Sequence, residues 1–410
     1  MPLRILAGVL ISTVLLLPCS AADFVGLGAR WDTLYGEASA VSGDGTTVVG
    51  SGNRGEQERP VGFRWVAGAG YDRESWVYPV LDTSFDGQTV LSGFNGESGG
   101  TAATWRAGDR PEDFRLIEPQ EGAFSMYGTA ISADGSSVVG YANFPPVQDS
   151  PARAFRWSAD TGVEWLGSLQ PDEHWVAAWG VSGDGRVAVG FSSTNEPSNQ
   201  RAFRWSADEG MQALGSLPGM SQSVAGAASF DGQVIVGTAS EAEESEAFRW
   251  TAATGMVGLG GLPNEPVFSV ARSVSADGEI IIGMAASTSS PFAYEPFLWT
   301  ADQGMRRLQQ VLIDDYGLGG QLAGWTLYSA DDISADGHVI VGAGRNPQGG
   351  FESWRAVVPE PPAWQLAAGL AMLLAARRFA RRTGHRVGLS SGSSKPRMSA
   401  RRCAVTIPLG

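Results

Sequence analysis

Cysteine is almost absent from this sequence: only Cys19 and Cys403 occur among 410 residues, and both lie near the ends. The body of the chain, residues 23–358, also has no lysine and only two histidines, His174 and His338. These absences exclude a cysteine nucleophile, a lysine Schiff base and a cysteine-rich zinc site. They also leave the body without a disulfide, so its hydrophobic core alone must hold it together.

Basic residues are scarce in the body as well. The span from Asp23 to Glu360 holds all 43 acidic residues but only 19 of the 29 basic ones, which gives it a net charge of −24. A surface this acidic excludes nucleic acid as a partner, because phosphate contacts need Lys and Arg. It also repels anionic lipid, so we expect membrane contact only through the ends of the chain.

Long apolar runs are missing from the body and occur only near the two ends. At the N-terminus, an early positive charge, an apolar run and small residues before Asp23 are typical of a secretory signal peptide, which we predict to cover residues 1–22. Acylation of Cys19 is the alternative, but Pro18 stands where a lipoprotein signal has a small residue.

What the body does have is a repeated motif, Ser-x-Asp-Gly followed by a β-branched run, as in "VSADGEIIIG". Its seven copies carry Asp44, Asp86, Asp134, Asp184, Asp231, Asp277 and Asp336. An aromatic segment such as "AFRW" follows each copy, and several continue into a run such as "GMVGLG". A catalytic residue is seldom needed seven times, but a turn is. We therefore interpret these Asp side chains as acceptors of backbone N–H bonds and the glycines as residues with positive φ.

Each repeat indicates four short strands, rich in Val, Ile and aromatic residues and bounded by Gly, Asp, Asn or Pro. Seven such units predict an all-β fold, a seven-bladed β-propeller of four-stranded blades over residues 23–358, with a solenoid as the alternative. The seventh copy lacks a fourth strand, whereas "DFVGLG", residues 23–28, precedes the first copy as an extra strand. We expect this N-terminal strand to pair into the last blade and close the ring.

The repeats resemble the extracellular repeat family named for its His-Ala-Phe (HAF) motif, found in exported bacterial proteins. The "SxDGxxVVG", "AFRW" and "GMxxLG" units carry this likeness over nearly the whole body. Arg153, Arg201 or Glu246 stands where the family has its histidine. The resemblance implies an exported repeat protein and assigns it no reaction.

The C-terminal segment "PEPPAWQLAAGLAMLLAARRFARR", residues 359–382, is similar to the PEP-CTERM sorting signal. The likeness rests on a tripeptide, a short apolar segment and a basic cluster: Pro359, Glu360, Pro361, Arg377, Arg378, Arg381 and Arg382. It implies processing by exosortase, a membrane peptidase, with the arginines held in the cytoplasm. The apolar segment is shorter than the ~20 residues that cross a bilayer, so it needs its flanks to do so, and a simple membrane anchor is the alternative. Residues 383–410 are expected to be a disordered tail.

Side chains that carry chemistry are few outside the repeat motif. His338 occupies a strand position that varies among the copies, and His174 lies in a loop, so neither is expected to be a ligand. Three acidic pairs remain, and adjacent carboxylates in loops are more often solvated than catalytic: Asp172 with Glu173, Asp314 with Asp315, and Asp331 with Asp332. The spacing differs from the aspartate box of sialidases, and no Asp-x-Asp-x-Asp-Gly calcium loop occurs. We predict no catalytic residue, no metal site and no cofactor.

Two further segments give structural predictions. In "AFRW" strands, Phe and Trp face one side and Arg the other, so the aromatic pair should fill the core between blades. The arginine should then be partly buried and need a carboxylate or carbonyl partner.

Between the sixth and seventh repeats, "MRRLQQVLIDDYG" predicts a short amphipathic helix ending at Gly317, which either adds a distinctive surface or caps the ring.

The sequence favours an exported, non-enzymatic propeller at the surface or in the extracellular matrix of a Gram-negative bacterium. Its role would be structural or binding, toward polysaccharide, an envelope component or a protein. The alternative is a secreted carboxylate-dependent glycan hydrolase or lyase with its site at the mouth of the central tunnel. Acids from several blades that converge in one cleft with perturbed pKa values would favour the enzyme.

Overall fold

A computed structural model of the protein describes residues 21–28, 36–53, 60–71, 79–96, 99–108, 114–120, 122–145, 151–194 and 199–359. The chain divides into two compact units, Met1–Pro359 and Glu360–Gly410, and the described residues belong to the first. Nearly all of the predicted signal peptide, the sorting signal from Glu360 onward and the tail lie outside the described residues. Among the described residues, no helix is long and apolar enough to span a membrane.

The described residues form short strands almost throughout. The first half contains β1 (Asp23–Gly26), β2 (Gly36–Val41), β3 (Thr47–Asn53), β4 (Pro60–Val66), β5 (Gly70–Tyr71), β6 (Val80–Thr83), β7 (Thr89–Gly96), β8 (Gly99–Arg106), β9 (Arg115–Leu116), β10 (Ser125–Ile131), β11 (Ser137–Asn143), β12 (Ala152–Ser158), β13 (Gly162–Trp165), β14 (Trp175–Val181) and β15 (Val187–Ser193). The second half contains β16 (Arg201–Ser206), β17 (Gly210–Ala213), β18 (Gln222–Ala228), β19 (Ile235–Glu241), β20 (Glu244–Thr251), β21 (Gly255–Gly258), β22 (Ser269–Val274), β23 (Ile280–Ala286), β24 (Tyr294–Thr300), β25 (Gly304–Arg307), α1 (Leu308–Asp314), a 3-10 turn (Leu318–Gly320), β26 (Thr326–Leu327), β27 (Asp332–Ile333), β28 (Val339–Arg345) and β29 (Phe351–Val357).

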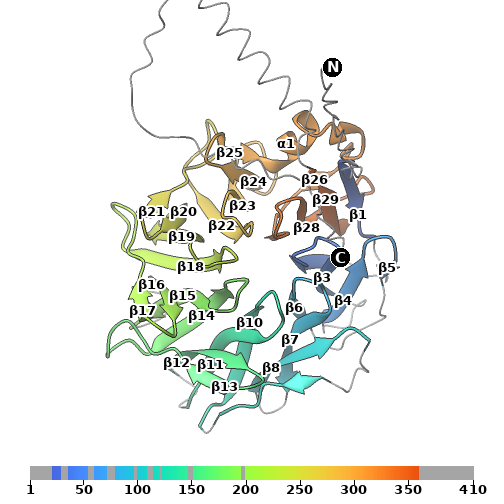
Figure 1. Ribbon diagram of the computed structural model, residues 1–410. Helices are drawn as coiled ribbons and strands as arrows, with labels where there is room; N and C mark the ends of the chain where they lie inside the picture. Colours follow the sequence, from blue (N-terminus) through green and yellow to red (C-terminus); the bar gives the residue numbers. More distant parts are fainter. Residues whose placement is uncertain are drawn as a thin grey trace, which may run out of the picture. The chain divides into compact units, whose positions relative to one another are not determined.

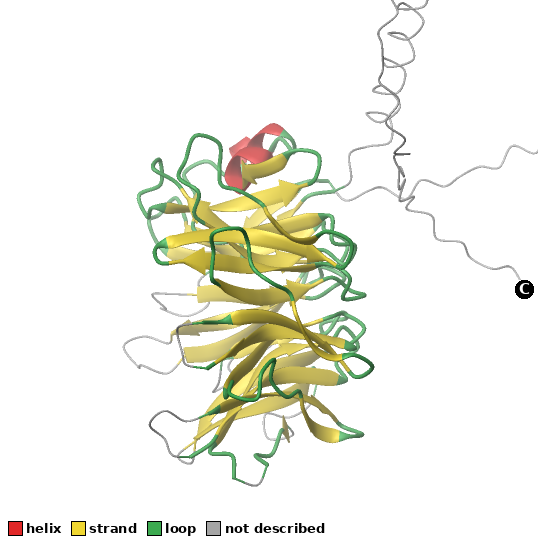
Figure 2. Ribbon diagram, turned by 90° about the vertical axis from the view of Figure 1, so that its left-hand side faces the viewer, coloured by secondary structure: helices red, strands yellow, loops and turns green. Residues whose placement is uncertain are grey.

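These strands form antiparallel sheets that follow one another around a ring in chain order (Figure 1). Figure 2, turned by 90°, shows the strands of successive sheets lying one above another. Within the described residues there are six hydrogen-bonded sheets. Four of them have four strands each: β2–β5, β6–β9, β18–β21 and β22–β25. The predicted all-β propeller arrangement is confirmed.

The division into sheets differs from seven separate four-stranded units. Strands β10–β17 form one eight-stranded sheet, because a parallel pair, Ala152 with Trp175, joins β12 to β14. The last sheet has five strands, because two short strands, β26 and β27, pair along the same edge of β28. The first strand of the seventh repeat is therefore interrupted, where the other repeats have one continuous strand.

The ring closes through the N-terminal strand, as predicted. Strand β1 pairs antiparallel with β29, so that Phe24 lies opposite Ala356. The Phe24 side chain is 6% exposed and packs against Trp325 and Trp354, with ring centroids 5.2 and 5.9 Å away. Strand β1 therefore covers the edge of β29, becomes the outer strand of the last sheet in its place, and buries an aromatic side chain at the same time.

Each Ser-x-Asp-Gly segment forms the same turn between the first and second strands of its repeat. In every copy the serine hydroxyl donates to the Asp Oδ1 at 2.6 to 2.8 Å, and the amide two residues after the Asp donates to the same oxygen at 2.9 to 3.1 Å. The glycines have φ between 64° and 77°, for example Gly278 at 73°. The Asp therefore organises the turn, and the Gly supplies a backbone conformation that other residues rarely adopt.

The seven turns are joined to one another by backbone hydrogen bonds that run in a complete circle. Each turn donates one amide to the carbonyl of the residue after the next repeat's serine, at 2.7 to 3.1 Å. The donors and acceptors are Asp44 to Phe85, Phe85 to Ala133, Ala133 to Gly183, Asp184 to Phe230, Phe230 to Ala276, Ala276 to Ala335, and Ala335 to Gly43. The last bond joins the seventh turn to the first, so the circle has no open end.

The aromatic segments pack between neighbouring units. Phe155, Phe203 and Phe248 are fully buried, and each lies in a cluster that combines residues of its own repeat with those of an adjacent one. In the last repeat the pairing register places Trp354 opposite Gly342, where five of the other six repeats place phenylalanine and the second places Ala103. The "ESW" tryptophan therefore takes the phenylalanine position, which corrects the alignment of that motif with "FRW".

The arginines of these segments have the partners that burial requires. Three of them donate from Nε to the carbonyl of the turn glycine in the next repeat: Arg64 to Gly87 at 2.9 Å, Arg156 to Gly185 at 3.0 Å and Arg249 to Gly278 at 3.3 Å. Arg204 instead pairs with Glu209. In the last repeat Arg355 Nη2 donates to Gly45 O at 2.9 Å, across the ring closure. The prediction of carbonyl or carboxylate partners is confirmed.

The predicted amphipathic helix is present but shorter than its sequence pattern. It begins at Leu308, because Met305 belongs to β25, and Gly317 follows its end with φ 73°. Leu308, Val311 and Leu312 are buried in the cluster that also contains Trp354. The helix thus lies at the outer side of the last two repeats (Figure 1) and does not cap the ring.

We expect the closing contact to control stability. Phe24→Ala should lower the free energy of unfolding by about 3 to 5 kcal/mol, because it empties an aromatic site where the two ends of the ring meet. Val257→Ala is the control, since Val257 is 49% exposed on an outer strand and should change stability by less than about 0.5 kcal/mol. Urea unfolding measures the free energy of unfolding of both variants. If Phe24→Ala lowers it as little as Val257→Ala does, Phe24 does not have this role.

Candidate functional site

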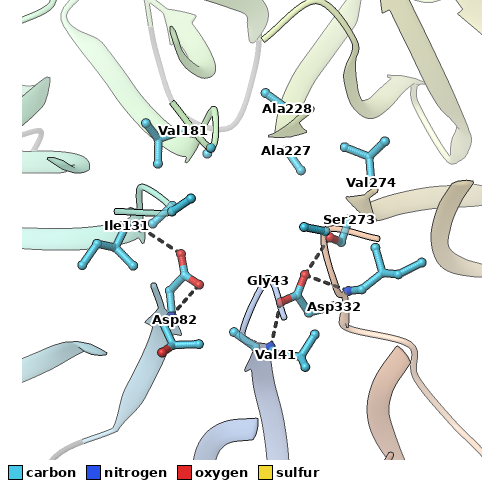
Figure 3. A pocket seen from close by; sticks show the side chains of 18 of the residues that line it. Val41, Gly43, Asp82, Ile131, Val181, Ala227, Ala228, Ser273, Val274 and Asp332 are labelled. Carbon is cyan, nitrogen blue, oxygen red and sulfur yellow. Dashed lines mark hydrogen bonds between the residues drawn. The ribbon is translucent and has the colours of Figure 1, made fainter. Parts of the chain in front are cut away.

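The first strands of the repeats line a channel along the ring axis, with a cavity volume of about 270 Å³ (Figure 3). Every repeat contributes the same four positions to its wall: the three residues before the repeat serine and the one after it. In the fourth repeat, for example, these are Trp179, Gly180, Val181 and Gly183. The channel is therefore the one place where all seven copies of the motif converge.

Three of these four positions are nearly uniform among the copies. The residue before the serine is mostly β-branched, and the residue after it is Gly or Ala in five copies and Phe in two. The residue two before the serine is Ala, Gly or Ser in five copies and Asp in two, Asp82 and Asp332. The residue three before the serine differs in every copy. These seven residues, here called the bulge ring, are Ser39, Leu81, Thr129, Trp179, Gly226, Arg272 and Asp331.

The bulge ring takes its name from its backbone. In six repeats the pairing of the first two strands skips the ring residue, as at Trp179 between Ala178 and Gly180. In the seventh repeat Asp331 lies in the interruption between β26 and β27. A β-bulge leaves one residue outside the regular ladder and redirects its side chain. Here it places a different residue at the channel wall in each repeat.

The glycine that ends most copies of the motif is explained by this bulge. A Cβ at Gly190 would lie 2.0 Å from the carbonyl oxygen of Ala177, and one at Gly140 would lie 1.8 Å from that of Tyr127. The backbone before the bulge presses against the second strand, so that strand needs a glycine there. In the second repeat Ser92 takes this place, and its hydroxyl donates to the Pro79 carbonyl at 2.8 Å.

Two carboxylates in the channel link neighbouring strands. Asp82 accepts the amide of Ile131, in the next repeat, at 2.8 Å, and Asp332 accepts the amide of Val41 at 2.8 Å. Asp332 also accepts the Ser273 hydroxyl at 2.7 Å, from the preceding repeat. Figure 3 shows the two carboxylates on either side of the strand that carries Val41. Both oxygens of each group accept bonds, so these carboxylates satisfy amides on the inner edges of the first strands.

Both carboxyl groups are harder to ionise than usual. Burial raises the pKa of Asp82 to about 7, and the negative charge of Asp332 adds to the shift. Burial raises the pKa of Asp332 to about 6 against the opposing effect of its hydrogen bonds. Burial also raises the pKa of Asp331, which accepts the Ser329 hydroxyl at 2.5 Å. Each residue is only partly exposed, so desolvation of its charged form outweighs the hydrogen bonds that it accepts.

Most of the acidic residues singled out in the sequence lie outside the channel. The seven repeat aspartates each remain in their own turn. Glu173 is buried against Arg201 and Ser192, and Asp315, just after α1, pairs with Arg306. Among the three acidic pairs, only Asp331 with Asp332 reaches the channel.

The two body histidines lie away from the channel wall. His174 is exposed, and His338 Nδ1 lies 3.2 Å from an oxygen of its own turn aspartate, Asp336. Within the part of the chain that the structure describes, no group of three or more His, Cys, Asp or Glu side chains is placed to hold a metal ion.

Sequence reasoning missed Asp82 and Trp179. Neither lies in a recognisable motif, and each is a departure from its neighbours in the other copies. A signal existed, however, because an alignment of the seven copies shows an Asp at a small-residue position and a position that never repeats. That signal acquires meaning only when both positions are known to face the channel.

No protein-family model matches this chain, and no curated protein matches it. Among solved structures, TolB from Acinetobacter baumannii is 12% identical, with 77% of this chain and 80% of that chain covered and a TM-score of 0.41. Prolyl oligopeptidase B from Galerina marginata is 11% identical, with 75% of this chain and 46% of that chain covered and a TM-score of 0.47. Likenesses this weak transfer no function to this chain.

The raised pKa values predict a particular pH dependence of stability. Between the ordinary value of 3.8 and the folded values of about 6 and about 7, the folded chain binds more protons than the unfolded chain. The contribution of Asp82 and Asp332 to stability is therefore full below that window and lost as pH rises through it.

Asp82→Asn removes one of these titrations. The melting temperature of this variant relative to the native chain should rise by about 2 to 5 °C between pH 5 and pH 8. Asp160→Asn, in an exposed turn, is the control and should show no such trend. If the melting temperatures of Asp82→Asn and the native chain change in parallel with pH, the pKa of the Asp82 carboxyl group is not raised.

Proposed function

We propose that this protein is an exported binding propeller with seven blades, which takes its ligand at the central channel and is presented at the cell surface. The circle of seven turn-to-turn hydrogen bonds supports the blade count, as does the equal contribution of every repeat to the channel. The eight-stranded sheet then counts as two blades, because a single residue pair joins its two four-stranded halves. The HAF-type resemblance of the repeats fits an exported protein of this kind.

The bulge ring carries the proposal. A fold needs its turns and its core to repeat, so those positions are nearly the same in every copy. The bulge ring does the opposite: it breaks the strand ladder in each repeat and then places a different side chain there. β-Bulges are over-represented next to active sites, where they redirect a side chain, so this pattern supports a ligand-binding surface in the channel.

Export and surface delivery rest on the two ends of the chain. Residues 1–22 would be removed as a signal peptide, and the acidic body would leave membrane contact to residues 359–382. A membrane peptidase of the exosortase type would recognise Pro359, Glu360 and Pro361 and release the body to the surface or the matrix. The basic cluster would hold the far end of the apolar segment in the cytoplasm.

Intact-mass analysis of the protein recovered from cells tests this processing. The native chain should begin at Asp23 and lack the segment that follows the tripeptide. Replacement of Pro359, Glu360 and Pro361 by alanine should leave that segment attached and keep the protein in the membrane fraction. Removal of residues 383–410 is the control and should change neither result. A native protein that retains its C-terminal segment would contradict the sorting role.

Filling the channel tests the binding site. Gly226→Trp adds a large side chain to the bulge ring, and a Cβ there would meet nothing closer than 3.8 Å, so the fold should tolerate it. The matched control is Gly320→Trp on the outer 3-10 turn, where a Cβ would meet nothing within 4 Å. The labelled native chain and control should bind envelope fractions of the producing bacterium, and Gly226→Trp should bind about tenfold less. Equal binding by all three would place the site elsewhere.

A second candidate function, a carboxylate-dependent glycan hydrolase or lyase, is favoured by one observation: two channel acids, Asp82 and Asp332, have raised pKa values. Against it stands their bonding, since both oxygens of each carboxylate already accept hydrogen bonds from the ring. Incubation of the native chain and the Asp82→Asn and Asp332→Asn variants with polysaccharides decides between the two. Release of new reducing or unsaturated ends by the native chain alone would establish the enzyme.

A further inference from the structure

The bulge ring has two unlike sides. Leu81, Thr129 and Trp179 come from the second, third and fourth repeats, whereas Arg272 and Asp331 come from the sixth and seventh. Leu81 is 36% exposed and Trp179 is 42% exposed, so both present apolar surface to the channel. The bulge ring therefore places an apolar arc, Leu81 and Trp179, opposite a polar arc, Arg272 and Asp331. The neighbouring wall position adds Asp332 beside the polar arc and Asp82 beside Leu81.

The apolar arc continues outward as a row of aromatic rings. The ring of Tyr141 lies 6.0 Å from that of Trp179, at an interplanar angle of 56°, and the ring of Tyr127 lies 5.1 Å beyond it, at 28°. Tyr127 and Tyr141 are direct cross-strand partners on β10 and β11. A Cβ at Gly100 would lie 2.4 Å from the Tyr127 ring, so this neighbour has no room for a side chain. The row leads from the channel wall onto the third repeat.

The polar arc offers both kinds of hydrogen-bonding group. Within the described residues Arg272 forms no ion pair at bonding distance, and its Nη2 donates to Met284 Sδ at 3.7 Å. Asp331 is held by Ser329, and Arg272 favours its charged form. The fifth repeat, which lies between the fourth and the sixth, contributes Gly226 and Ala227 to the wall, and their small side chains leave space beside both arcs. A ligand can therefore touch both arcs at once.

We infer that the bulge ring binds a neutral polysaccharide built from pyranose units, with one sugar between Trp179 and the Arg272–Asp331 side and further sugars along Tyr141 and Tyr127. A pyranose ring has an apolar face of C–H groups, which stack on an aromatic π face, and a rim of hydroxyls, which need donors and acceptors. The two arcs supply these in the matching arrangement. The row of rings suits a chain rather than a single sugar. The bulge ring carries both signs of charge, and the wall carboxyl groups of Asp82 and Asp332 are already bonded within the ring, which suits a ligand without net charge.

This inference rests on the proposed function and makes it specific. The inference assigns sugar stacking to Trp179 and not to the tryptophans of the repeat motif. The motif residues Trp157 and Trp205 are buried between repeats, at 8% and 6% exposure. Trp165 provides a matched comparison, since it is 36% exposed and contacts Phe144, yet it lies on the outer strand β13 and not in the channel wall.

The test is a glycan microarray probed with the purified full chain, followed by titration calorimetry with the best neutral oligosaccharide. Trp179→Ala should weaken binding by about 10- to 100-fold, Trp179→Phe should retain most of it, and Trp165→Ala should leave it unchanged. Arg272→Gln and Asp331→Asn should each weaken binding by about tenfold. Because Trp179 is largely exposed, its variants should keep the native melting temperature, which is measured in parallel.

Binding of neutral saccharides that depends on Trp179 and not on Trp165 supports the inference. It is overturned if the native chain binds no saccharide on the array, binds only charged ones, or binds equally well after Trp179→Ala. The envelope assay separates this failure from that of the proposed function. If Gly226→Trp abolishes envelope binding while no saccharide binds, the channel is a binding site for another class of ligand, such as a peptide. If Gly226→Trp has no effect, the channel function itself fails.

Discussion

The circle of backbone hydrogen bonds between the seven Ser-x-Asp-Gly turns is the constraint on which the rest of the molecule depends. Because each turn donates to the next, the first strands are drawn to a common axis and the same four positions of every repeat face the channel. The bonds use backbone groups alone, so the circle makes no demand on the side chains around it. This is why turns and core can repeat while one channel position varies freely.

A circle also needs its ends to meet, and here the two ends of the body are far apart in sequence. The N-terminal strand adds to β29, Arg355 bonds to Gly45, and Ala335 bonds to Gly43. Each contact is ordinary by itself. Together they offset the entropy of closing a very long loop, and they are joined there by a buried cluster that the first and last repeats share, with Val41, Phe63 and Val341 among its members.

Two adjacent positions of the first strands have different roles in the channel. Two Asp side chains, Asp82 and Asp332, satisfy amides on the inner edges of neighbouring strands, and burial makes them weak acids. The preceding residue of each repeat, the member of the bulge ring, stands outside the strand ladder and lines the channel. Acids that look catalytic by their pKa are thus bonded into the wall, whereas Trp179 and Arg272 remain available to a ligand. A shifted pKa marks a buried carboxylate, and only its bonding partners tell what it does.

The sequence alone determined the strands, the turns, the all-β class and the closing N-terminal strand, because each depends on residues close together in the chain or on the repetition of one motif. Only the tertiary structure decided which side chains meet at the axis. A bulge is a property of two paired strands, so Trp179 could not be recognised from its own neighbours. The pKa of Asp82 depends on burial by the whole ring, and the amide that Asp332 accepts belongs to Val41, 291 residues away.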